Sequence, residues 1–358
     1  MSLPIPTGSS DRALRVVAIG GGTGLSTLLR GLKAFVPMHD RRRTPRPTTP
    51  HAHTGPIIAE LSAVVTVTDD GGSSGRLRED FNILPPGDIR NCMVALSEDE
   101  HLLAQLFRYR FNQGELQGHN FGNLFVAALS NITGDFAQAV QMSSQILRTR
   151  GRIFPATTAN VNLAAQMDDG SVVRGETSIT ASKQKIIELM LEPAEVDPLP
   201  QTLEAIANAD LITLGPGSLY TSLITNLLVR GIPEALAASR ATKVYVCNLM
   251  TQANESLGLT ASQHIEKIQQ HAGSAHGPLF DYALINTAPI SPALLAQYAS
   301  EGQEPILADL DRVRALGVEP ITGSFVHEGN VLRHDYDRVA ETLLQLATTR
   351  AIPTTMHA

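Results

Sequence analysis

The chain has 358 residues, 43% of them hydrophobic, and this length can bury a large core, with roughly two domains as the broad expectation. Its 35 acidic residues outnumber its 28 basic ones, giving a net charge of -7, so no excess of positive charge is available to neutralise a nucleic-acid backbone. No apolar run approaches the roughly 20 residues that cross a bilayer, and the first residues lack the apolar core of a secretory signal, so we expect a cytoplasmic protein without a membrane span.

The amino-terminal part of the chain predicts two strands with a helix between them. Residues 15–19 form an apolar run that ends at glycines, and residues 25–35 carry leucines at helical spacing. A second apolar run at residues 61–67 is rich in β-branched side chains. Between them, residues 38–56 contain four arginines, three histidines and four prolines without an apolar period, which predicts a flexible insertion. We also expect residues 1–13 to form a flexible extension and residues 350–358 a tail.

The remaining elements predict one Rossmann-like domain over residues 14–349. Residues 122–132 and 136–147 have helical patterns, and residues 161–173 read as a hairpin around Asp168-Asp169-Gly170. Further strands are expected at residues 210–214, 243–247 and 282–285, and the first of these is followed by a helix over 219–229. Such alternation predicts a doubly wound α/β fold with a mainly parallel sheet and helices on both faces. Helices within residues 75–150 interrupt the alternation and are expected to form a small helical subdomain.

The two cysteines, Cys92 and Cys247, lie far apart in apolar stretches. This placement favours core thiols over a disulfide framework or a cysteine-bound metal.

A first glycine-rich loop, GGGTGLS at residues 20–26, joins the first strand to the first helix. Backbone N–H groups and the helix dipole converge on an anion at such a position. The predicted phosphate-binding residues here are Gly21, Gly22, Thr23 and Gly24. The dinucleotide fingerprint would need a glycine where Leu25 stands, and the lysine of a P-loop is missing. A tight turn is the alternative, but four glycines in five residues exceed what a turn needs.

A second loop places two adjacent carboxylates before a serine- and glycine-rich segment. Within a strand the two would point to opposite sides, unless the strand has already ended. One of them is suited to ribose hydroxyls or to Mg²⁺, and the donor-rich segment is suited to an anion. A solvated turn with a capping aspartate is the alternative reading. The candidate binding residues are Asp69, Asp70, Gly71, Gly72, Ser73 and Ser74.

Two further segments lie at predicted helix starts. In PPGDIRN at residues 85–91, Asp88 is either a helix N-cap or a third acidic ligand, and the local pattern favours the cap. If a metal is bound, Asp70 and Asp88 are the predicted ligands, and we expect them to meet across the site. In GHNFGN at residues 118–123, His119, Asn120 and Asn123 are candidates for phosphate or sugar hydroxyls. His119 is also a candidate general base, although a hydrogen-bonded structural histidine is the more common case.

A second glycine loop, GPGSLYTS at residues 215–222, repeats the arrangement of strand, glycine loop and helix. It predicts a second anion site with hydroxyl groups on the first helical turn. Asn248 follows a later strand at the same predicted sheet edge, where ligand contact and simple loop capping are equal alternatives. The candidate residues are Gly215, Gly217, Ser218, Thr221 and Asn248.

With these loops in order, the chain resembles the YvcK-like family, named gluconeogenesis factor, and more distantly the 2-phospho-L-lactate transferases called CofD. The resemblance extends from about Arg15 to the last helix. It is carried by GGGTGLS at 20–26, TVTDDGGSSGRLR at 66–78, PPGDIRN at 85–91, GHNFGN at 118–123, ITGDF at 132–136, GPGSLYTS at 215–222 and CNLMTQ at 247–252.

The resemblance implies a Rossmann-like fold, a cytosolic location and binding of UDP-sugars such as UDP-N-acetylglucosamine. It also implies a role in cell shape and wall growth on gluconeogenic carbon sources. From the transferases it carries over a phosphate site at Gly21 to Gly24 and metal-type carboxylates at Asp69 or Asp70 and at Asp88.

Three functions are compatible with these residues. The favoured one is a UDP-sugar-binding regulatory protein, because no motif for hydrolytic or acyl-transfer catalysis is present. The alternatives are a Mg²⁺-dependent transferase of a phosphorus-containing group, and a dinucleotide-binding protein with pyrophosphate at Gly20 to Gly24. Leu25 weakens the last of these. Whether any reaction is catalysed, which proteins are partners and whether the chain forms a homo-oligomer stay open.

Overall fold

The computed structural model of the chain describes residues 13–37, 57–98, 102–273 and 277–350. The predicted insertion at 38–56, nearly all of the extension at 1–13 and the tail beyond residue 350 lie outside these described residues. Within the described part, both cysteines are free and buried, which confirms that they are core thiols.

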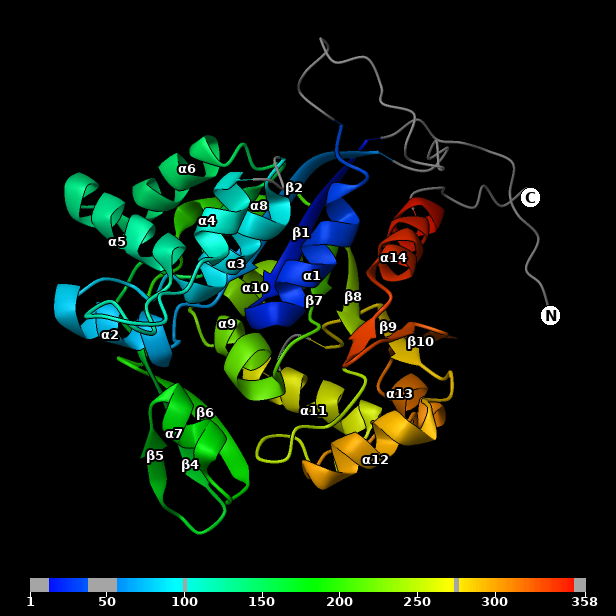
Figure 1. Cartoon of the computed structure of the whole chain (residues 1–358). Helices are drawn as coiled ribbons and strands as arrows, with labels where there is room; N and C mark the ends of the chain where they lie inside the picture. The colour runs from blue at the N-terminus through cyan, green and yellow to red at the C-terminus, as the bar shows by residue number, and fades with distance from the viewer. Residues whose placement is uncertain (1–12, 38–56, 99–101, 274–276, 351–358) are drawn as a thin grey trace.

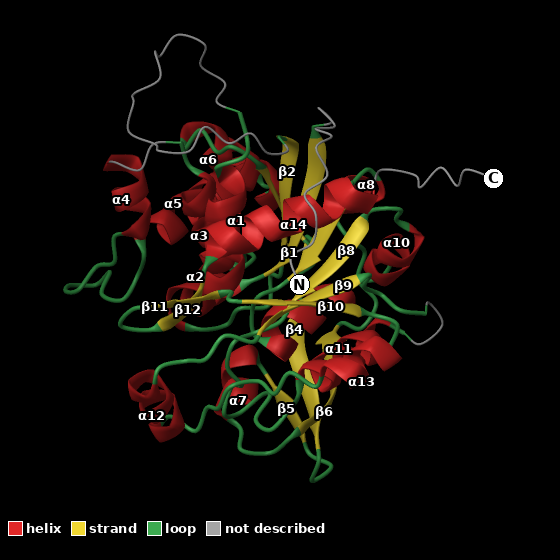
Figure 2. Ribbon diagram, turned by 90° about the vertical axis from the view of Figure 1, so that its right-hand side faces the viewer, coloured by secondary structure: helices red, strands yellow, loops and turns green. Residues whose placement is uncertain are grey.

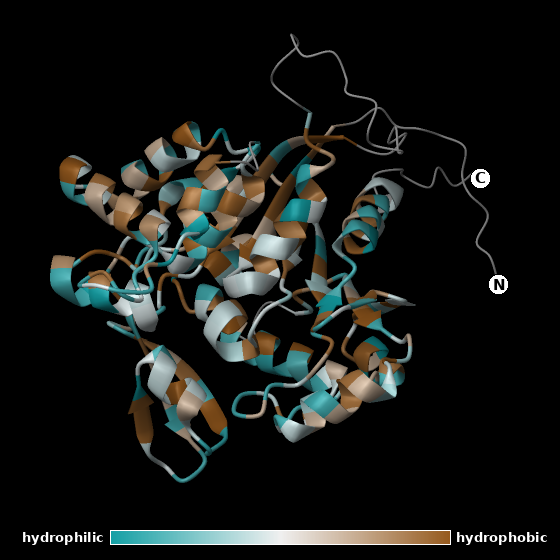
Figure 3. Cartoon of the chain, in the orientation of Figure 1, coloured by the Kyte–Doolittle hydropathy of each residue, from teal (hydrophilic) through white to brown (hydrophobic). Residues whose placement is uncertain are grey.

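The centre of the molecule is a seven-stranded sheet in which every neighbouring pair is parallel (Figure 1). In sheet order the strands are β10 (Glu319–Gly323), β9 (Tyr282–Asn286), β8 (Thr242–Val246), β7 (Leu211–Leu214), β1 (Leu14–Gly20), β2 (Ile58–Val65) and β3 (Arg152–Pro155). β1 is almost wholly buried along its length, because a parallel sheet has both faces covered and its strands therefore carry continuous apolar runs. Figure 3 shows the same strands coloured as hydrophobic.

Helices cover both faces of this sheet, which confirms the Rossmann-like α/β fold. One face carries α1 (Gly22–Lys33), α3 (Gly87–Leu96) and α14 (Tyr336–Arg350), and α1 packs against both of the others. The opposite side carries α8 (Pro200–Ala207) and α10 (Ile232–Ala238), as Figure 2 shows. The four leucines of α1 at helical spacing are completely buried, so the periodicity seen in the sequence marks the face that meets the sheet.

The interruption after β2 is helical, as predicted. It comprises α2 (Gly72–Phe81), α3, α4 (Leu102–Arg108), α5 (Phe121–Thr133) and α6 (Phe136–Ile146). Phe107, Val126 and Val140 from α4, α5 and α6 belong to the same buried cluster as the sheet, so the core of this helical region is continuous with the main core. Its standing as a separate subdomain stays a prediction.

A small antiparallel sheet projects from the carboxyl side of the central sheet (Figure 1). It consists of β5 (Val172–Arg174), β4 (Asn162–Met167) and β6 (Ile186–Glu192), with α7 (Glu176–Ala181) between β5 and β6. The predicted hairpin is confirmed as β4 and β5. The sequence analysis missed β6, whose outer side chains are exposed, and it also missed β3 and β10 at the two edges of the central sheet.

The predicted helix over 219–229 is split into a π-helix, η1 (Leu219–Ile224), and the short α9 (Thr225–Leu227). The remaining elements are α11 (Ala261–Ala272), α12 (Pro292–Ser300), α13 (Leu310–Ala315), β11 (Val326–Glu328) and β12 (Leu332–His334). Among the described residues, no helix is both long and apolar enough to span a membrane.

The strand order puts the functional loops together. From β1 the chain proceeds to β2 and β3 on one side, and it later resumes at β7 on the other side of β1. The carboxyl ends of β1 and β7 therefore flank the point where the direction of winding reverses. In open parallel sheets, ligands bind in the crevice outside this point.

Candidate functional site

The glycine-rich loops touch one another at the carboxyl edge of the sheet. A side chain at Gly24 would collide with the backbone carbonyl of Pro216, which brings the two glycine loops into direct contact. A Cβ atom at Gly21 would lie 2.8 Å from both Asp88 Oδ2 and Thr66 Cγ2. These glycines are needed because backbone passes within contact distance of backbone and buried side chains. The structure thus joins the loops that the sequence analysis treated one by one.

Asp88 has a different role from the predicted helix cap. The N-cap of α3 is Pro86, and the Asp88 side chain makes no cap hydrogen bond to its own helix. Instead, the backbone N–H of Gly22 donates to Asp88 Oδ2 at 2.7 Å, so this carboxylate lies at the start of α1. Burial, followed by the charge of Asp69, raises the pKa of Asp88 to about 6. The Asp88 carboxylate therefore accepts the N–H of Gly22, which the sequence analysis had assigned to a phosphate.

Asp69 and Asp70 diverge, but for a reason other than strand alternation. β2 ends at Val65, four residues earlier than Asp69, so both carboxylates lie in a loop. Asp69 Oδ1 accepts the N–H of Gly71 at 2.9 Å, while Asp70 Oδ1 accepts the N–H and the hydroxyl of Thr177 at 2.9 and 2.6 Å. The carboxylate that faces Asp88 is therefore Asp69, which corrects the expected meeting of Asp70 with Asp88.

Two further glutamates complete an acidic cluster made of Asp69, Asp88, Glu176 and Glu255. Glu176 begins α7, and Thr68 Oγ1 donates to its carboxylate at 3.5 Å. Burial, then the charges of Asp69 and Asp88, raise the pKa of Glu176 to about 9. Glu255 is buried and accepts the N–H of Tyr220 at 3.2 Å and the hydroxyl of Thr221 at 3.0 Å. The sequence analysis missed both glutamates because they lie in segments with no motif and reach the cluster only through folding.

The second glycine loop is held by amide side chains. The N–H of Gly217 donates to Asn248 Oδ1 at 3.1 Å, and Asn248 Nδ2 donates to the carbonyl of Gly217 at 2.7 Å. Gln252 Nε2 donates to Ser218 Oγ at 2.9 Å. Asn248 thus caps the loop, which is the plainer of its two predicted roles. Gly215 has φ of +84°, a left-handed conformation that favours glycine.

The histidine segment is organised as a helix cap. Asn120 is the N-cap of α5, and its side chain accepts the N–H of Asn123 at 3.2 Å. The His119 ring is buried, its Nδ1 lies 3.3 Å from Ser73 Oγ, and burial lowers the pKa of the ring. Ser73 Oγ also accepts the N–H of Asn120 at 3.2 Å. These contacts match a structural histidine that joins α2 to α5.

The remaining loop residues sit at the start of α2. Gly72 is the first residue of α2 and has φ of +50°. Ser74 is buried, and a Cβ atom at Gly87 would lie only 2.4 Å from the Ser74 hydroxyl oxygen, so only glycine fits at position 87. Arg78, farther along α2, donates to Asn160 Oδ1 and to the carbonyl of Val161, and so ties this loop to the start of β4.

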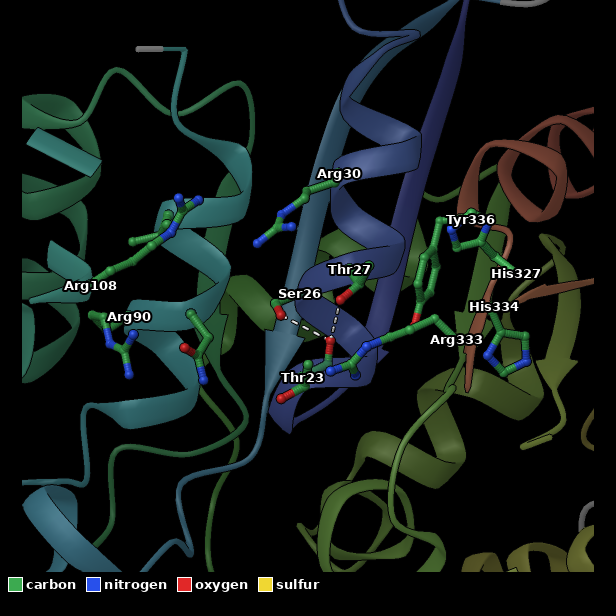
Figure 4. A pocket seen from close by; sticks show the side chains of 12 residues that line it. Thr23, Ser26, Thr27, Arg30, Arg90, Arg108, His327, Arg333, His334 and Tyr336 are labelled. Atoms are coloured by element: carbon green, nitrogen blue, oxygen red, sulfur yellow. Dashed lines mark hydrogen bonds between the residues drawn. The ribbon is translucent and has the colours of Figure 1, made fainter. Parts of the chain in front are cut away.

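A pocket of about 460 Å³ lies on the other side of the α1 start (Figure 4). We call it the arginine pocket. Its lining residues come from α1, α3, α4, β11, β12 and α14, and none of them is acidic: Thr23, Ser26, Thr27, Arg30, Arg90, Asn91, Val94, Arg108, His327, Arg333, His334 and Tyr336. Of the predicted site residues only Thr23 belongs to it. The four arginines were missed because they come from four elements and follow no local pattern.

The electrostatics of this pocket are those of an anion site. Burial, followed by the charge of Arg110, lowers the pKa of Arg90 to about 10, and Arg108 adds to the repulsion. Arg90 Nε donates to Asn123 Oδ1 at 3.2 Å, which holds the guanidinium in place. Guanidinium groups form paired hydrogen bonds with phosphate oxygens, and a bound anion would relieve their mutual repulsion.

The acidic cluster fits a metal ion only in part. Among the described residues, no group of three or more histidine, cysteine, aspartate or glutamate side chains could hold a metal ion. Mg²⁺ is commonly held by one or two carboxylates together with water and substrate phosphates. Asp69 and Asp88 could supply the two carboxylates of such a site, and a bound Mg²⁺ stays a prediction.

Comparison with known proteins gives the family. The family model described as 2-phospho-L-lactate transferase CofD matches residues 16–326. A gluconeogenesis factor of Halalkalibacterium halodurans is 47% identical over 332 residues, 92% of this chain and 95% of that protein, and the one of Bacillus subtilis is 44% identical over 93% of this chain and 98% of that protein. A crystal structure of a Bacillus halodurans protein superposes with a TM-score of 0.84 at 46% identity, covering 93% of this chain and 100% of that chain. The chain belongs to the YvcK-like gluconeogenesis factor family, which shares the CofD family model.

Proposed function

We propose that this protein is a cytoplasmic regulatory protein that binds a nucleotide-sugar, with UDP-sugars as the ligand class. We further propose that it supports cell shape during growth on gluconeogenic carbon sources, in line with the gluconeogenesis factors it resembles. The observation that carries the binding proposal is the arginine pocket, with four guanidinium groups and no carboxylate in its lining.

A diphosphate suits this pocket better than a single charge. Arg30 projects from α1 toward α3 and α4, which carry Arg90 and Arg108, and Arg333 reaches the pocket from β12 on the opposite side (Figure 4). A nucleoside diphosphate brings charges that are spread over two phosphate groups, so opposite arginines can each contact one group. Tyr336 offers an aromatic surface beside them for a planar base.

The position of Asp88 directs phosphate to the arginine side. Its carboxylate accepts the N–H of Gly22 at 2.7 Å, so a pyrophosphate at that N–H would meet a negative charge. This contact removes support from the dinucleotide-binding alternative, which needs pyrophosphate at the first glycine loop. We infer that the loop shapes the start of α1, while the arginines supply the charge that holds the ligand.

Calorimetric titration tests the proposal. We expect UDP-N-acetylglucosamine and UDP to bind, UMP to bind more weakly, and uridine and NAD to bind at least about tenfold more weakly than UDP, a difference of about 1.4 kcal/mol. Arg312 on α13 is exposed and does not line the pocket, so Arg312→Gln is a matched control. If uridine bound as tightly as UDP, or if Arg90→Gln left the affinity for UDP unchanged, the arginine pocket would not be the phosphate site.

A Mg²⁺-dependent transferase is the second candidate, and the acidic cluster beside the pocket favours it. When bound, Mg²⁺ would neutralise charge on the transferred group, while Asp69 and Asp88 would hold the ion. The test is product formation from a nucleoside-diphosphate-activated phospholactate and an alcohol acceptor, with Mg²⁺ and with chelator. Turnover that requires Mg²⁺ and is lost in Asp88→Asn would favour the transferase over the binding protein.

A further inference from the structure

The positive charge of the arginine pocket is not balanced by the residues that line it. Among these described residues, four are arginines and none carries a carboxylate. Arg30, Arg108 and Arg333 make no hydrogen bond or ion pair with another residue in the described part of the chain (Figure 4). Arg90 donates to the uncharged amide of Asn123. The guanidinium charges are therefore available to an anionic ligand.

The acidic cluster behind the pocket offsets only part of this charge. Asp88 is the aspartate whose charge acts on Arg90 and raises the pKa of its guanidinium. Burial and the charge of Arg110 have the larger effects, and they lower this pKa below its ordinary value. The Asp88 carboxylate also accepts the N–H of Gly22 at 2.7 Å. Positive charge stays in excess on the side of α3 that carries Arg90.

The hydroxyl groups of α1 leave the charged contacts to the arginines. Ser26 and Thr27 both donate to the carbonyl of Thr23, at 3.0 and 2.8 Å. A hydroxyl group has one proton, so these two protons are not available to a phosphate oxygen. Charge-assisted hydrogen bonds to a phosphate are stronger than neutral ones. The affinity of the pocket for a phosphate group should therefore follow the negative charge on that group.

A nucleotide carries more charge without its sugar than with it. In a nucleotide-sugar, both phosphates are linked on two sides, and each carries a single charge. In a free nucleoside diphosphate, the terminal phosphate has a second pKa of about 6 and is close to doubly charged above pH 7. A nucleoside triphosphate carries one charge more. A UDP-sugar, UDP and UTP thus form a series of increasing charge on the same nucleoside.

We propose that free nucleoside di- and triphosphates compete with the nucleotide-sugar for the arginine pocket and bind it more tightly. This inference rests on the proposed nucleotide-sugar binding and assigns a regulation to the same pocket. One pocket cannot hold both ligands at once, so its occupancy by the nucleotide-sugar depends on the concentrations of both. The protein then responds to the ratio of nucleotide-sugar to free nucleotide.

The test compares ligands that differ by one charge. Calorimetric titration of the full chain at pH 8, in chelator so that no metal alters the ligand charge, uses UDP and its methyl ester on the terminal phosphate. The ester removes one charge and adds no sugar. We expect UDP to bind about tenfold more tightly than the ester and than UDP-N-acetylglucosamine, a difference of about 1.4 kcal/mol. UTP should bind at least as tightly as UDP and displace UDP-N-acetylglucosamine.

Salt and two variants test the physical cause. In about 0.5 M NaCl, screening should reduce the tenfold preference for UDP over its methyl ester to about threefold or less. Arg30→Gln and Arg108→Gln, at exposed positions of the pocket, should each reduce it by a similar amount, because each removes one of the unpaired charges. Arg312→Gln, outside the pocket, should leave the preference unchanged.

Two sets of results would overturn the inference, and they separate it from the proposed function. If UDP-N-acetylglucosamine binds but UDP binds no more tightly than its methyl ester or than UDP-N-acetylglucosamine, the charge preference is wrong and the nucleotide-sugar site stands. The same holds if UTP does not displace UDP-N-acetylglucosamine, or if both variants keep the full preference. If none of these nucleotides binds, the proposed function fails together with the inference.

Discussion

The acidic cluster and the arginine pocket are neighbours of opposite charge on either side of the first turns of α1 and α3. Asp88 belongs to one and Arg90 to the other, although only one residue separates them on α3. Two positions along an α-helix turn a side chain by about 200°, so adjacent acidic and basic residues point to opposite sides. The first turn of α3 therefore directs Asp88 toward the acidic cluster and Arg90 toward the arginine pocket.

In both regions, the surroundings disfavour the charged form of the ionisable side chains. Burial, followed by like charges, raises the pKa of Asp88 and of Glu176 and lowers the pKa of Arg90. Folding alone gains nothing from gathering like charges, and such perturbed groups cluster at functional sites. The difference between the regions is in their construction. Loops at the carboxyl edge, α7 and the first turn of α3 build the acidic cluster, whereas helices α1, α3 and α4 with the carboxyl-terminal segment build the arginine pocket.

The largest loss of stability is expected where the two glycine loops touch, at the start of α1 between the acidic cluster and the arginine pocket. Gly24→Ala places a Cβ atom 2.3 Å from the carbonyl oxygen of Pro216. Because this oxygen belongs to the backbone and cannot rotate away, the two glycine loops must separate, at a cost of about 3 kcal/mol or more. Gly22→Ala is the matched variant, since its Cβ would meet only Ser222 Oγ at 3.7 Å, an ordinary contact, and the strain comes from its φ of +64°, at about 1 kcal/mol. Urea denaturation measures both. Equal destabilisation by the two variants would show that the loops are not in tight contact.

The arginine pocket is tested through its most buried guanidinium. We expect Arg90→Gln to weaken UDP-sugar binding by about 100-fold, or about 2.7 kcal/mol, because a charge-assisted contact to phosphate is lost. Titration calorimetry gives the affinity, and circular dichroism shows whether the variant is folded. A folded variant with the affinity of the wild type would move the phosphate site away from α3.

The acidic cluster is tested through pH. The pKa of Glu176 is about 9 in the fold, above its ordinary value of 4.5, so between these values the folded chain holds a proton that the unfolded chain has released. The contribution of Glu176 to the free energy of unfolding therefore falls as pH rises through this window. Glu176→Gln should be more stable than the wild type at pH 8 by roughly 1–2 kcal/mol, and equal to it near pH 4.5.

Denaturation curves at both pH values check this expectation, and the exposed Glu341→Gln serves as the control. A stability difference that is the same at pH 4.5 and pH 8 would mean that burial and the neighbouring carboxylates do not raise the pKa of Glu176. Added Mg²⁺ sharpens the test: if the cluster binds it, the wild type at pH 8 gains stability and Glu176→Gln gains less.

The smallest effect separates the two neighbouring aspartates. Asp69→Asn should weaken UDP-sugar binding about tenfold in Mg²⁺, or about 1.4 kcal/mol, and change little in chelator. Asp70→Asn should change less, because its carboxylate accepts hydrogen bonds from Thr177. Titration of both variants under both conditions decides between them. A larger Mg²⁺-dependent loss in Asp70→Asn would restore the pairing of Asp70 with Asp88 that the sequence suggested.

Local pattern was sufficient for the elements and loops whose signal lies within a few residues. The apolar run of β1, the leucine spacing of α1 and the apolar helix after GHN at 118–120 are visible in the sequence, because strand burial and helical periodicity depend on near neighbours. The capping role of Asn120 was not predicted, since the sequence analysis assigned this residue to a ligand. The order of the motifs also identified the family. The edge strands β3 and β10 escaped because short, partly exposed strands carry little periodic signal.

Tertiary structure alone decided which charges meet. Asp88 looked like a cap for its own helix, yet it reaches the N–H of Gly22, 66 residues earlier in the chain. Glu176 arrives from α7, and Arg333 joins Arg30 and Arg90 only because folding brings β12 to the same pocket as α1 and α3. A charged side chain is recognisable at any position, but its pKa and its partners depend on burial and on contacts between distant segments. The sequence by itself determined the fold and the loops, and the packing of α3 against α1 determined where the negative and positive charges of the site gather.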